Sequence, residues 1–522
     1  MLGSDAAPVL RPWKRLTKYS AGTALLALLA TCIILAFNAH APSSALTASA
    51  EVLTAAAFLL GVLALVTGLE TLTHSRPNLT RPLIFLLIIT LAVFAAHMYI
   101  INAPPVSAGQ SCAATKQGCV GDESYYLPEA LRMLDGLPCS TNSALTPNCH
   151  LEHPFLTKAM MAAGMAIFGV NSFGARIFIV VLGTLCIPLL YVLVSMLSGN
   201  RRFAFFSCLL LAADTLFFVQ SSIAMLEIPS VFFGILAFVF YFWQGSIWKL
   251  DNQVAAGISL GLSMLCKETG VFMALALVSY HLYASRKSLP ETLKGLLKLA
   301  VPGLLVFIAG LQVYAMLFTT ATTPNFISEI QYIFSYGNSL KGCDPNWIDP
   351  VLHRCPTPFD WILFYSPSSW FSSTVTVTIT SGGVTKVETY VGVAFYKMTN
   401  PIVVWLLFAW APLAVAMKLR KRPDGVPESR DDSTAIFMLF WFFWTWFPYV
   451  LLWSPLVDRT IYPFYILATV PAFAAGSAYF ITREWFPSKM AIVYLIAAFA
   501  WFFLYFPVKD FLPVWIRVLL GR

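Results

Sequence analysis

The chain has 522 residues, of which 58% are hydrophobic and only 11% are charged. Soluble globular proteins carry about 25% charged residues, so a soluble chain of this length could not keep its surface hydrated with so few. The formal net charge of +8 is spread along the chain and forms no basic patch, which excludes a nucleic-acid-binding protein. The composition also excludes disordered, collagen-like and small disulfide-stabilised proteins. We therefore expect an integral membrane protein with many spans.

Apolar segments along the whole chain predict about thirteen membrane-spanning helices, each of which needs about 20 mostly apolar residues. The segments are residues 19–37, 45–68, 83–103, 173–197, 203–221, 227–247, 253–267, 270–284, 299–318, 400–417, 434–453, 460–481 and 490–507. The first segment is too long for a cleaved signal peptide and is followed by no clean cleavage site, so we expect it to be retained. Lys267 to Gly270 should form a turn near one interface, between two short spans.

The distribution of basic residues predicts the orientation of these spans. With the N-terminus and its Arg11, Lys14, Arg15 and Lys18 in the cytoplasm, the cytoplasmic ends carry most of the Lys and Arg residues at the higher density. Two long segments, residues 104–172 and 319–399, then lie on the external face.

Six of the ten cysteines lie in these two external segments, namely Cys112, Cys119, Cys139 and Cys149 in the first and Cys343 and Cys355 in the second. An even number in each segment predicts disulfides in an oxidising compartment. Zinc binding is the alternative, but the spacings 112–119 and 139–149 are wider than typical finger-like ligand pairs. Four cysteines permit three pairings, and the sequence does not choose among them.

The external segments also contain predicted secondary structure. Residues 121–136 have helical periodicity, and residues 153–169 predict an amphipathic helix lying along the interface. Residues 373–379 and 384–391 alternate with period two around Gly382-Gly383, which predicts a small β-hairpin. This hairpin is either a passive external feature or one that contacts substrate.

Asp122 and Glu123 form the most informative polar pair, because they follow a predicted span on the external face. One carboxylate could act as general base on a hydroxyl nucleophile, and the other could raise its partner's pKa or hold a substrate. The alternative is an acidic pair that only stabilises the start of a helix.

Further ionisable residues lie near the predicted membrane edges, and each has a functional and a purely structural explanation. The basic ones could neutralise a lipid phosphate, but an arginine can also reach the interface without a ligand, and Lys267 could pair with Glu268. The histidine could be an interfacial residue, and Glu227 a helix cap. These candidates are His153, Arg176, Glu227, Lys267 and Arg459. No nucleotide-binding, metalloprotease or serine-hydrolase motif occurs, and no ligand cluster requires a metal.

Five motifs in order resemble the protein O-mannosyltransferase family: GDESYY, HPFLTKAMMAAGMAIFG, ARIFIVVLGTLCIPLLYVLVSML, LAADTLFFVQSSIAMLEIPSVFF and AAGISLGLSMLCKETGVF. The later PSSWF, TNPIVVW and DRTIYPFYILATVPAF resemble the C-terminal part of that family, so the resemblance covers roughly residues 83–481. This chain departs from the family pattern at Phe155, where a second proline is frequent, at Ser222, where an arginine is frequent, and at Glu227, where an aspartate is usual.

The resemblance implies an all-α polytopic membrane protein with a GT-C-type glycosyltransferase fold. Eleven core spans would lie in residues 83–522, and residues 1–82 would add two N-terminal spans. The external segment 319–399 is too short for the β-trefoil domain of eukaryotic members, which implies a prokaryotic, archaeal-type member.

The resemblance also implies a reaction, in which mannose passes from dolichyl or polyprenyl phosphate to Ser or Thr hydroxyls with inversion. Asp122 would be the base with Glu123 in support, Arg176, Lys267 and Arg459 would bind the donor phosphate, and His153 and Glu227 would bind substrate. We expect no cofactor or metal besides the lipid-linked donor, a secreted or membrane protein as acceptor, and a dimer as one assembly. The site would lie on the external face of the cell membrane. The alternatives are a lipid or glycan acceptor, and a non-enzymatic transporter of a lipid-linked sugar.

Overall fold

The computed structural model describes residues 81–104, 112, 118–139, 149–244, 250–319, 325–349, 352–363, 368–381, 384–419 and 429–508. The first two predicted spans, residues 19–37 and 45–68, lie outside these ranges, as does the Gly382-Gly383 turn. The division into residues 1–82 and 83–522 therefore stays a prediction.

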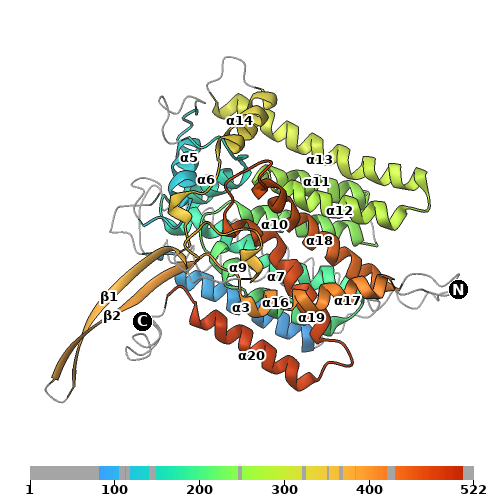
Figure 1. The fold of residues 1–522 in the computed structure, drawn as a ribbon. Coiled ribbons are helices and arrows are strands. Elements are labelled where there is room, and N and C mark those ends of the chain that lie inside the picture. The colour runs from blue at the N-terminus through green and yellow to red at the C-terminus, as the bar shows by residue number, and fades with distance from the viewer. Residues whose placement is uncertain are drawn as a thin grey trace, which may run out of the picture.

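Helices form the body of the protein, as the sequence predicts (Figure 1). They are α3 (Arg81–Ile100), α5 (Glu123–Leu134), α6 (Leu156–Phe168), α7 (Ser172–Ser198), α8 (Arg201–Ala212), α9 (Thr215–Gln220), α10 (Glu227–Phe242), α11 (Asn252–Cys266), α12 (Gly270–Ser285), α13 (Leu289–Phe318), α14 (Phe326–Ser339), α15 (Asp360–Leu363), α16 (Pro401–Trp405), α17 (Leu407–Leu419), α18 (Arg430–Trp453), α19 (Val470–Ile481) and α20 (Ser488–Leu504), with 3₁₀ turns η2 (Pro345–Trp347) and η3 (Pro463–Thr469). Within the described ranges, five helical segments are long and apolar enough to cross a membrane, and six shorter helices are also apolar.

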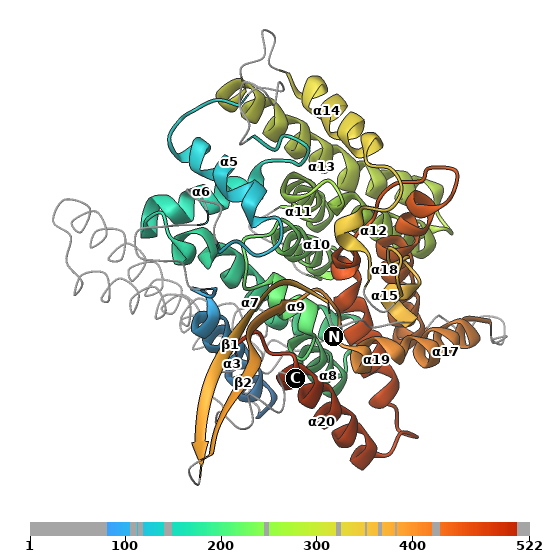
Figure 2. The ribbon, with the colours of Figure 1, turned by 60° about the vertical axis from the view of Figure 1, so that its left-hand side comes forward.

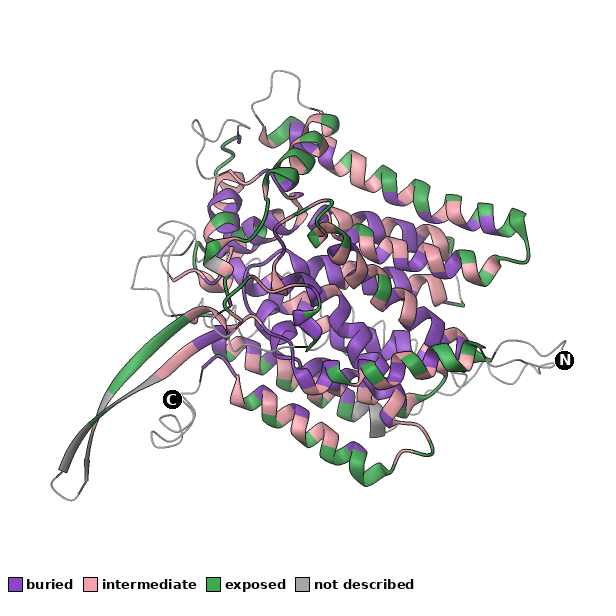
Figure 3. Ribbon diagram, viewed as in Figure 1, coloured by how far each residue is buried: buried purple, intermediate pink, exposed green. Residues whose placement is uncertain are grey.

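The outer helices keep large apolar side chains on the surface, which is the pattern expected when lipid is the solvent. On α13, Leu297, Leu305 and Met316 are each more than 60% exposed. Figure 3 shows the buried residues concentrated in the inner helices, whereas α13 and α20 present exposed faces. The predicted multi-pass membrane protein is therefore confirmed, although the number of spans stays a prediction.

The helix predicted for residues 203–221 is interrupted in the structure, and α8 and α9 replace it. Asp214 begins α9, because its Oδ1 accepts a hydrogen bond from the Phe217 amide at 2.8 Å and its Oδ2 accepts one from the Asn400 amide at 2.9 Å. The Asn400 side chain donates to the Ala213 and Ala498 carbonyls, both at 2.8 Å. These bonds satisfy the polar groups freed by the break, as an apolar surrounding requires.

The predicted β-hairpin is confirmed, and it is longer than expected. Strands β1 (Ser369–Ser381) and β2 (Val384–Tyr396) pair antiparallel and form a ribbon that projects from the body (Figures 1 and 2). The register shifts near the base of the ribbon, where Ser369 pairs with Tyr396 and Phe371 with Phe395, so that Trp370 is an extra residue on β1. Such a bulge redirects the side chain of the extra residue.

The structure contains three disulfides and so resolves the pairing that the sequence left open. Cys112 pairs with Cys119, Cys139 with Cys149, and Cys343 with Cys355. All three belong to the segments that carry α5, α14 and the base of the ribbon, which we call the site end of the bundle. Three cysteines in the described helices are free and buried, namely Cys186, Cys208 and Cys266.

We predict that the six paired cysteines resist alkylation in the folded and in the denatured protein until a reductant is added. Peptide mapping by mass spectrometry without reduction should recover these three linked pairs. The buried thiols serve as the internal control, since they should react on denaturation alone. Alkylation of all six site-end thiols without reductant would contradict the structure.

Candidate active site

Asp122 lies at the start of α5, immediately before its first helical residue. Gly121 precedes it with a φ of +58°, and the indole of Trp370 lies so close that a Cβ at this glycine would be 3.1 Å from Cδ1. Asp122 is half-buried, and its Oδ2 accepts a hydrogen bond from the Tyr126 hydroxyl at 3.4 Å. Its Oδ1 accepts no hydrogen bond from another described residue.

Burial raises the pKa of Asp122 to about 6, and the negative charge of Glu227 acts in the same direction. Lys267 and His153 oppose this shift, because their positive charges favour the carboxylate. These three predicted residues therefore lie close enough to Asp122 for their charges to act on it. A carboxyl group with a pKa near neutral pH is suited to general base catalysis.

His153 pairs with Glu268, a residue that the sequence suggested only as a partner of Lys267. Its Nδ1 lies 2.9 Å from Oε2 of Glu268, and its ring meets the edge of Tyr126 with centroids 5.9 Å apart. Burial would raise the pKa of Glu268, but the charges of His153 and Lys267 lower it to about 2. Glu268 is therefore ionised and fixes the orientation of the imidazole.

Lys267 lies in the break between α11 and α12, as predicted, and it pairs with Glu227 at the start of α10. Both side chains are buried, and the ammonium group lies 4.9 Å from the ring centroid of Tyr465. Oε2 of Glu227 is also buried, yet it accepts no hydrogen bond from the part of the chain that is described. Together with Thr269, Tyr449 and Tyr465, this pair lines a small pocket.

Arg176 and Glu123 form a separate, fully buried ion pair. Nε and Nη2 of Arg176 each donate to one Glu123 oxygen at 2.7 Å, while Nη1 donates to the carbonyls of Ile101 and Ala103. Glu123 also accepts from the amides of Val120 at 2.8 Å and Ala224 at 2.7 Å. This geometry gives Arg176 a structural set of partners, so its contact with a donor phosphate stays a prediction.

Arg459 lies between α18 and η3, next to Lys341 in a short β-bridge. Its guanidinium passes close under Gly337 of α14 and interacts electrostatically with Tyr465, as Asp122 does. Its buried Nε has no hydrogen-bond partner, and no other described residue forms an ion pair with its side chain. Of the three predicted phosphate ligands, it is the one without an ion-pair partner in the described part of the chain.

A third buried ion pair involves two residues that were not singled out in the sequence. Lys158 of α6 contacts Glu129 of α5 at 2.7 Å with both side chains fully buried, and Tyr314 donates to the same carboxylate oxygen at 2.8 Å. Lys158 also donates to the carbonyls of His150 at 2.8 Å and His153 at 3.0 Å. A single lysine within an otherwise apolar helix was the signal that could have revealed it.

The structure thus brings Asp122, His153, Glu227 and Lys267 together and places Arg459 near them through Tyr465. Glu123 and Arg176 support this group from within the bundle. The described residues contain no group of three or more His, Cys, Asp or Glu side chains placed to hold a metal ion. Among the described residues, the arrangement combines a carboxyl group with a raised pKa, a buried carboxylate oxygen without a hydrogen bond and an arginine without an ion-pair partner, and such a set could assist displacement of an anionic leaving group by a hydroxyl.

Comparison with known proteins relates this site to one family. Residues 152–311 match the family model described as dolichyl-phosphate-mannose-protein mannosyltransferase. This range includes His153, Arg176, Glu227 and Lys267. A polyprenol-phosphate-mannose–protein mannosyltransferase of Corynebacterium glutamicum is 24% identical over 435 residues, covering 70% of this chain and 77% of the relative. A protein of the same name from Mycolicibacterium smegmatis is 26% identical over 240 residues, covering 39% of this chain and 46% of the relative.

Two solved structures share the fold. The S. cerevisiae protein O-mannosyltransferase Pmt1-Pmt2 complex bound to the sugar donor aligns with a TM-score of 0.53 at 12% identity, covering 84% of this chain and 91% of that one. ArnT from Cupriavidus metallidurans bound to undecaprenyl phosphate aligns with a TM-score of 0.51 at 16% identity, covering 81% of this chain and 63% of that one. These similarities concern the fold alone.

We predict that Arg176→Met lowers the free energy of unfolding by about 3–5 kcal/mol, because it leaves the buried Glu123 carboxylate without its counter-charge. Thermal unfolding in detergent measures the effect. The double variant Glu123→Gln/Arg176→Met should unfold at a higher temperature than Arg176→Met, since no unpaired charge remains.

The matched control is Lys298→Met, which breaks the exposed pair with Asp251 and should cost less than about 1 kcal/mol. Equal destabilisation by Arg176→Met and Lys298→Met would contradict the structural role given to Arg176.

Proposed function

We propose that this chain, a glycosyltransferase of the protein O-mannosyltransferase family with a GT-C-type fold, transfers mannose from a polyprenyl phosphate to serine or threonine hydroxyls of proteins. The donor and the acceptor class come from the names of its relatives. The observation that supports the reaction in this chain is the position of Asp122, which is partly exposed, carries a raised pKa and lies among His153, Glu227 and Lys267.

In the proposed reaction, Asp122 accepts the proton of the acceptor hydroxyl. The hydroxyl oxygen forms a bond to the anomeric carbon of mannose, and the bond from that carbon to the phosphate oxygen breaks. The electron pair leaves with the polyprenyl phosphate, and the displacement from the opposite face inverts the anomeric carbon. The tyrosine that donates to one Asp122 oxygen leaves the other free for the hydroxyl.

The leaving phosphate needs a positive charge more than it needs a proton, because it is already anionic. Arg459 is the best candidate for this role, since its guanidinium has no counter-charge among the described residues. Lys267 contributes a second positive charge, but Glu227 compensates part of it. Arg176 acts indirectly, because its pairing with Glu123 holds the start of α5 and hence Asp122.

Glu227 and His153 are the proposed substrate-binding residues. The unpaired Oε2 of Glu227 can accept a hydrogen bond from a sugar hydroxyl, which would offset the cost of burying it. His153 lies beside Asp122 in an orientation set by Glu268, so its other ring nitrogen can meet the donor or the acceptor. No metal or cofactor takes part in this scheme.

We place the active site on the external face of the cell membrane, with the N-terminus in the cytoplasm. Two independent features support this placement. The basic residues predict it, and the three disulfides lie in the site-end segments, as an oxidising compartment requires. A dimer stays a prediction, because the structure holds a single chain.

We predict that Asp122→Asn lowers transfer by at least about 100-fold, because general base catalysis contributes about 10²–10⁴-fold. The purified protein is incubated with radiolabelled polyprenyl-phosphate mannose and a Ser/Thr peptide, and product is measured as peptide-bound mannose. Asp251→Asn is the matched control, since this exposed carboxylate caps the start of α11 and forms an ion pair with Lys298, away from the proposed site.

Unchanged transfer by Asp122→Asn would contradict the proposed base. Replacing the peptide by a lipid or glycan acceptor separates the acceptor classes, and transport of donor across proteoliposomes without transfer would support the non-enzymatic alternative.

We predict that kcat/KM rises with pH up to a pKa of about 6 and is constant above it. The ionised Asp122 is the base, so protonation below this pKa removes activity. Glu227→Gln should move this acidic limb to lower pH, because it removes a negative charge that raises the pKa of Asp122 and leaves the opposing Lys267 in place. A limb that stays at the same pH in Glu227→Gln would show that another group controls it.

A further inference from the structure

The two edges of the β1–β2 ribbon differ at its base. On the outer edge of β2, the Ala394 amide donates to the Pro507 carbonyl at 2.9 Å, and Val393 forms a bridge with Val508. The segment after α20 therefore covers this edge. On the outer edge of β1, no other described residue forms a backbone hydrogen bond with residues 370–375. An edge strand of this kind offers unpaired amide and carbonyl groups to another extended chain.

The open edge begins beside the proposed base. Trp370 is the extra residue of the β1 bulge, and its indole packs against Gly121, the residue before Asp122. The same indole meets Phe464 with ring centroids 5.5 Å apart, and Phe464 faces the ammonium group of Lys267. Its Nε1 is buried and has no hydrogen-bond partner in the described part of the chain. The bulge thus places the first residues of β1 next to Gly121 and Asp122.

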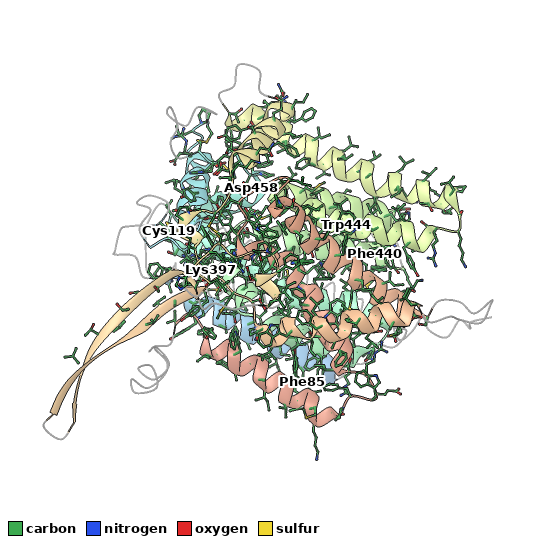
Figure 4. The ribbon with its side chains drawn as sticks, in the orientation of Figure 1. Phe85, Cys119, Lys397, Phe440, Trp444 and Asp458 are labelled. Carbon is green, nitrogen blue, oxygen red and sulfur yellow. A yellow bond between two sulfur atoms is a disulfide. The ribbon has the colours of Figure 1, made fainter. Side chains whose placement is uncertain are left out.

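The ribbon is held rigidly where it leaves the body. The Lys397 amide donates to the Ser368 carbonyl at 3.1 Å, which closes the base, and the ammonium group of Lys397 lies 3.9 Å from the ring of Trp347. Figure 4 labels Lys397 at this junction. From here β1 extends over 13 residues, which corresponds to roughly 43 Å of extended chain.

We propose that the open edge of β1 binds the acceptor polypeptide as an added strand and so guides its hydroxyl residues to Asp122. This inference rests on the proposed function, because it is the polypeptide acceptor that identifies the occupant. An extended polypeptide carries the amide and carbonyl groups that the edge lacks, and its path along β1 ends at Trp370 and Gly121. Backbone pairing also accepts many sequences, which suits an enzyme that modifies different proteins.

The experiment compares short and long acceptors on a protein with a shortened ribbon. Residues 375–390 are replaced by Asn-Gly, a two-residue turn that closes the ribbon at the paired Thr374 and Val391 and leaves Trp370 in place. Acceptors are peptides of about 5 and about 15 residues with one threonine, placed at either end of the long peptide. Polyprenyl-phosphate mannose is the donor, and initial rates give kcat and KM for each pair.

We expect KM for a long acceptor to rise by at least about fivefold in the shortened protein, the equivalent of one backbone hydrogen bond, while kcat and all constants for the short acceptor stay unchanged. The short acceptor is also the control for folding. Equal constants for long and short acceptors in both proteins, or an equal loss for both, would overturn the proposal. A ribbon that instead pairs with a second copy would change the oligomeric state without changing these constants, which also overturns it.

A second measurement tests the pairing itself. Methylation of successive backbone amides in the long acceptor removes one donor at a time. Strand addition predicts that, in the native protein, methylation raises KM at every second position of the acceptor, because alternate amides face the edge. In the shortened protein, methylation should no longer raise KM at the acceptor positions that lie opposite residues 375–381 in the native protein. A uniform or absent effect would overturn the proposal. If the native protein transfers mannose to no peptide, the proposed function fails first, which distinguishes the two failures.

Discussion

The ion pair between Glu123 and Arg176 is the interaction on which the site depends. Arg176 reaches from α7 to the carbonyls after α3, while Glu123 reaches from α5 to the amides of Val120 and Ala224. Four segments that are distant in the sequence therefore meet at two side chains. A charge at this depth is stable only when geometry and partners are complete, so the pair tolerates very little displacement of these segments. Asp122 immediately precedes Glu123, so the ion pair also fixes the position of Asp122.

Two pairs of residues adjacent in the sequence, Asp122–Glu123 and Lys267–Glu268, have different contacts within each pair. Glu123 points into the bundle and forms only structural contacts, whereas Asp122 is half-buried and one of its oxygens accepts no hydrogen bond from the described residues. Lys267 and Glu268 divide in the same way, because the lysine pairs with Glu227 and the glutamate with His153. In both cases two adjacent side chains of one short segment contact different partners. The same short segments thus supply both residues that stabilise the fold and residues of the proposed site.

The composition, the apolar segments and the alternation of residues 373–391 were sufficient to predict a helical membrane protein, the break at Lys267 and the β-hairpin. Even numbers of cysteines in each segment predicted the disulfides, although only the structure could choose the pairs. The interruption at Asp214 was missed, because its partner Asn400 is 186 residues away and no local signal reveals it. For the same reason, the sequence indicated Arg176 and Arg459 equally as phosphate ligands. Their difference lies in which long-range partners already compensate each charge, as Glu123 does for Arg176.

The Asn400 side chain has a mechanical consequence for the ribbon. It follows the root of β2 by four residues, and its bonds to Ala213 and Ala498 anchor that root in the helix bundle. Trp370 anchors the root of β1 against Gly121 at the start of the site. The ribbon therefore has one root in the helix bundle and the other beside Asp122, the proposed base. A load on its free end bends the strands themselves, and the clamped roots keep the position of Trp370 against the site unchanged.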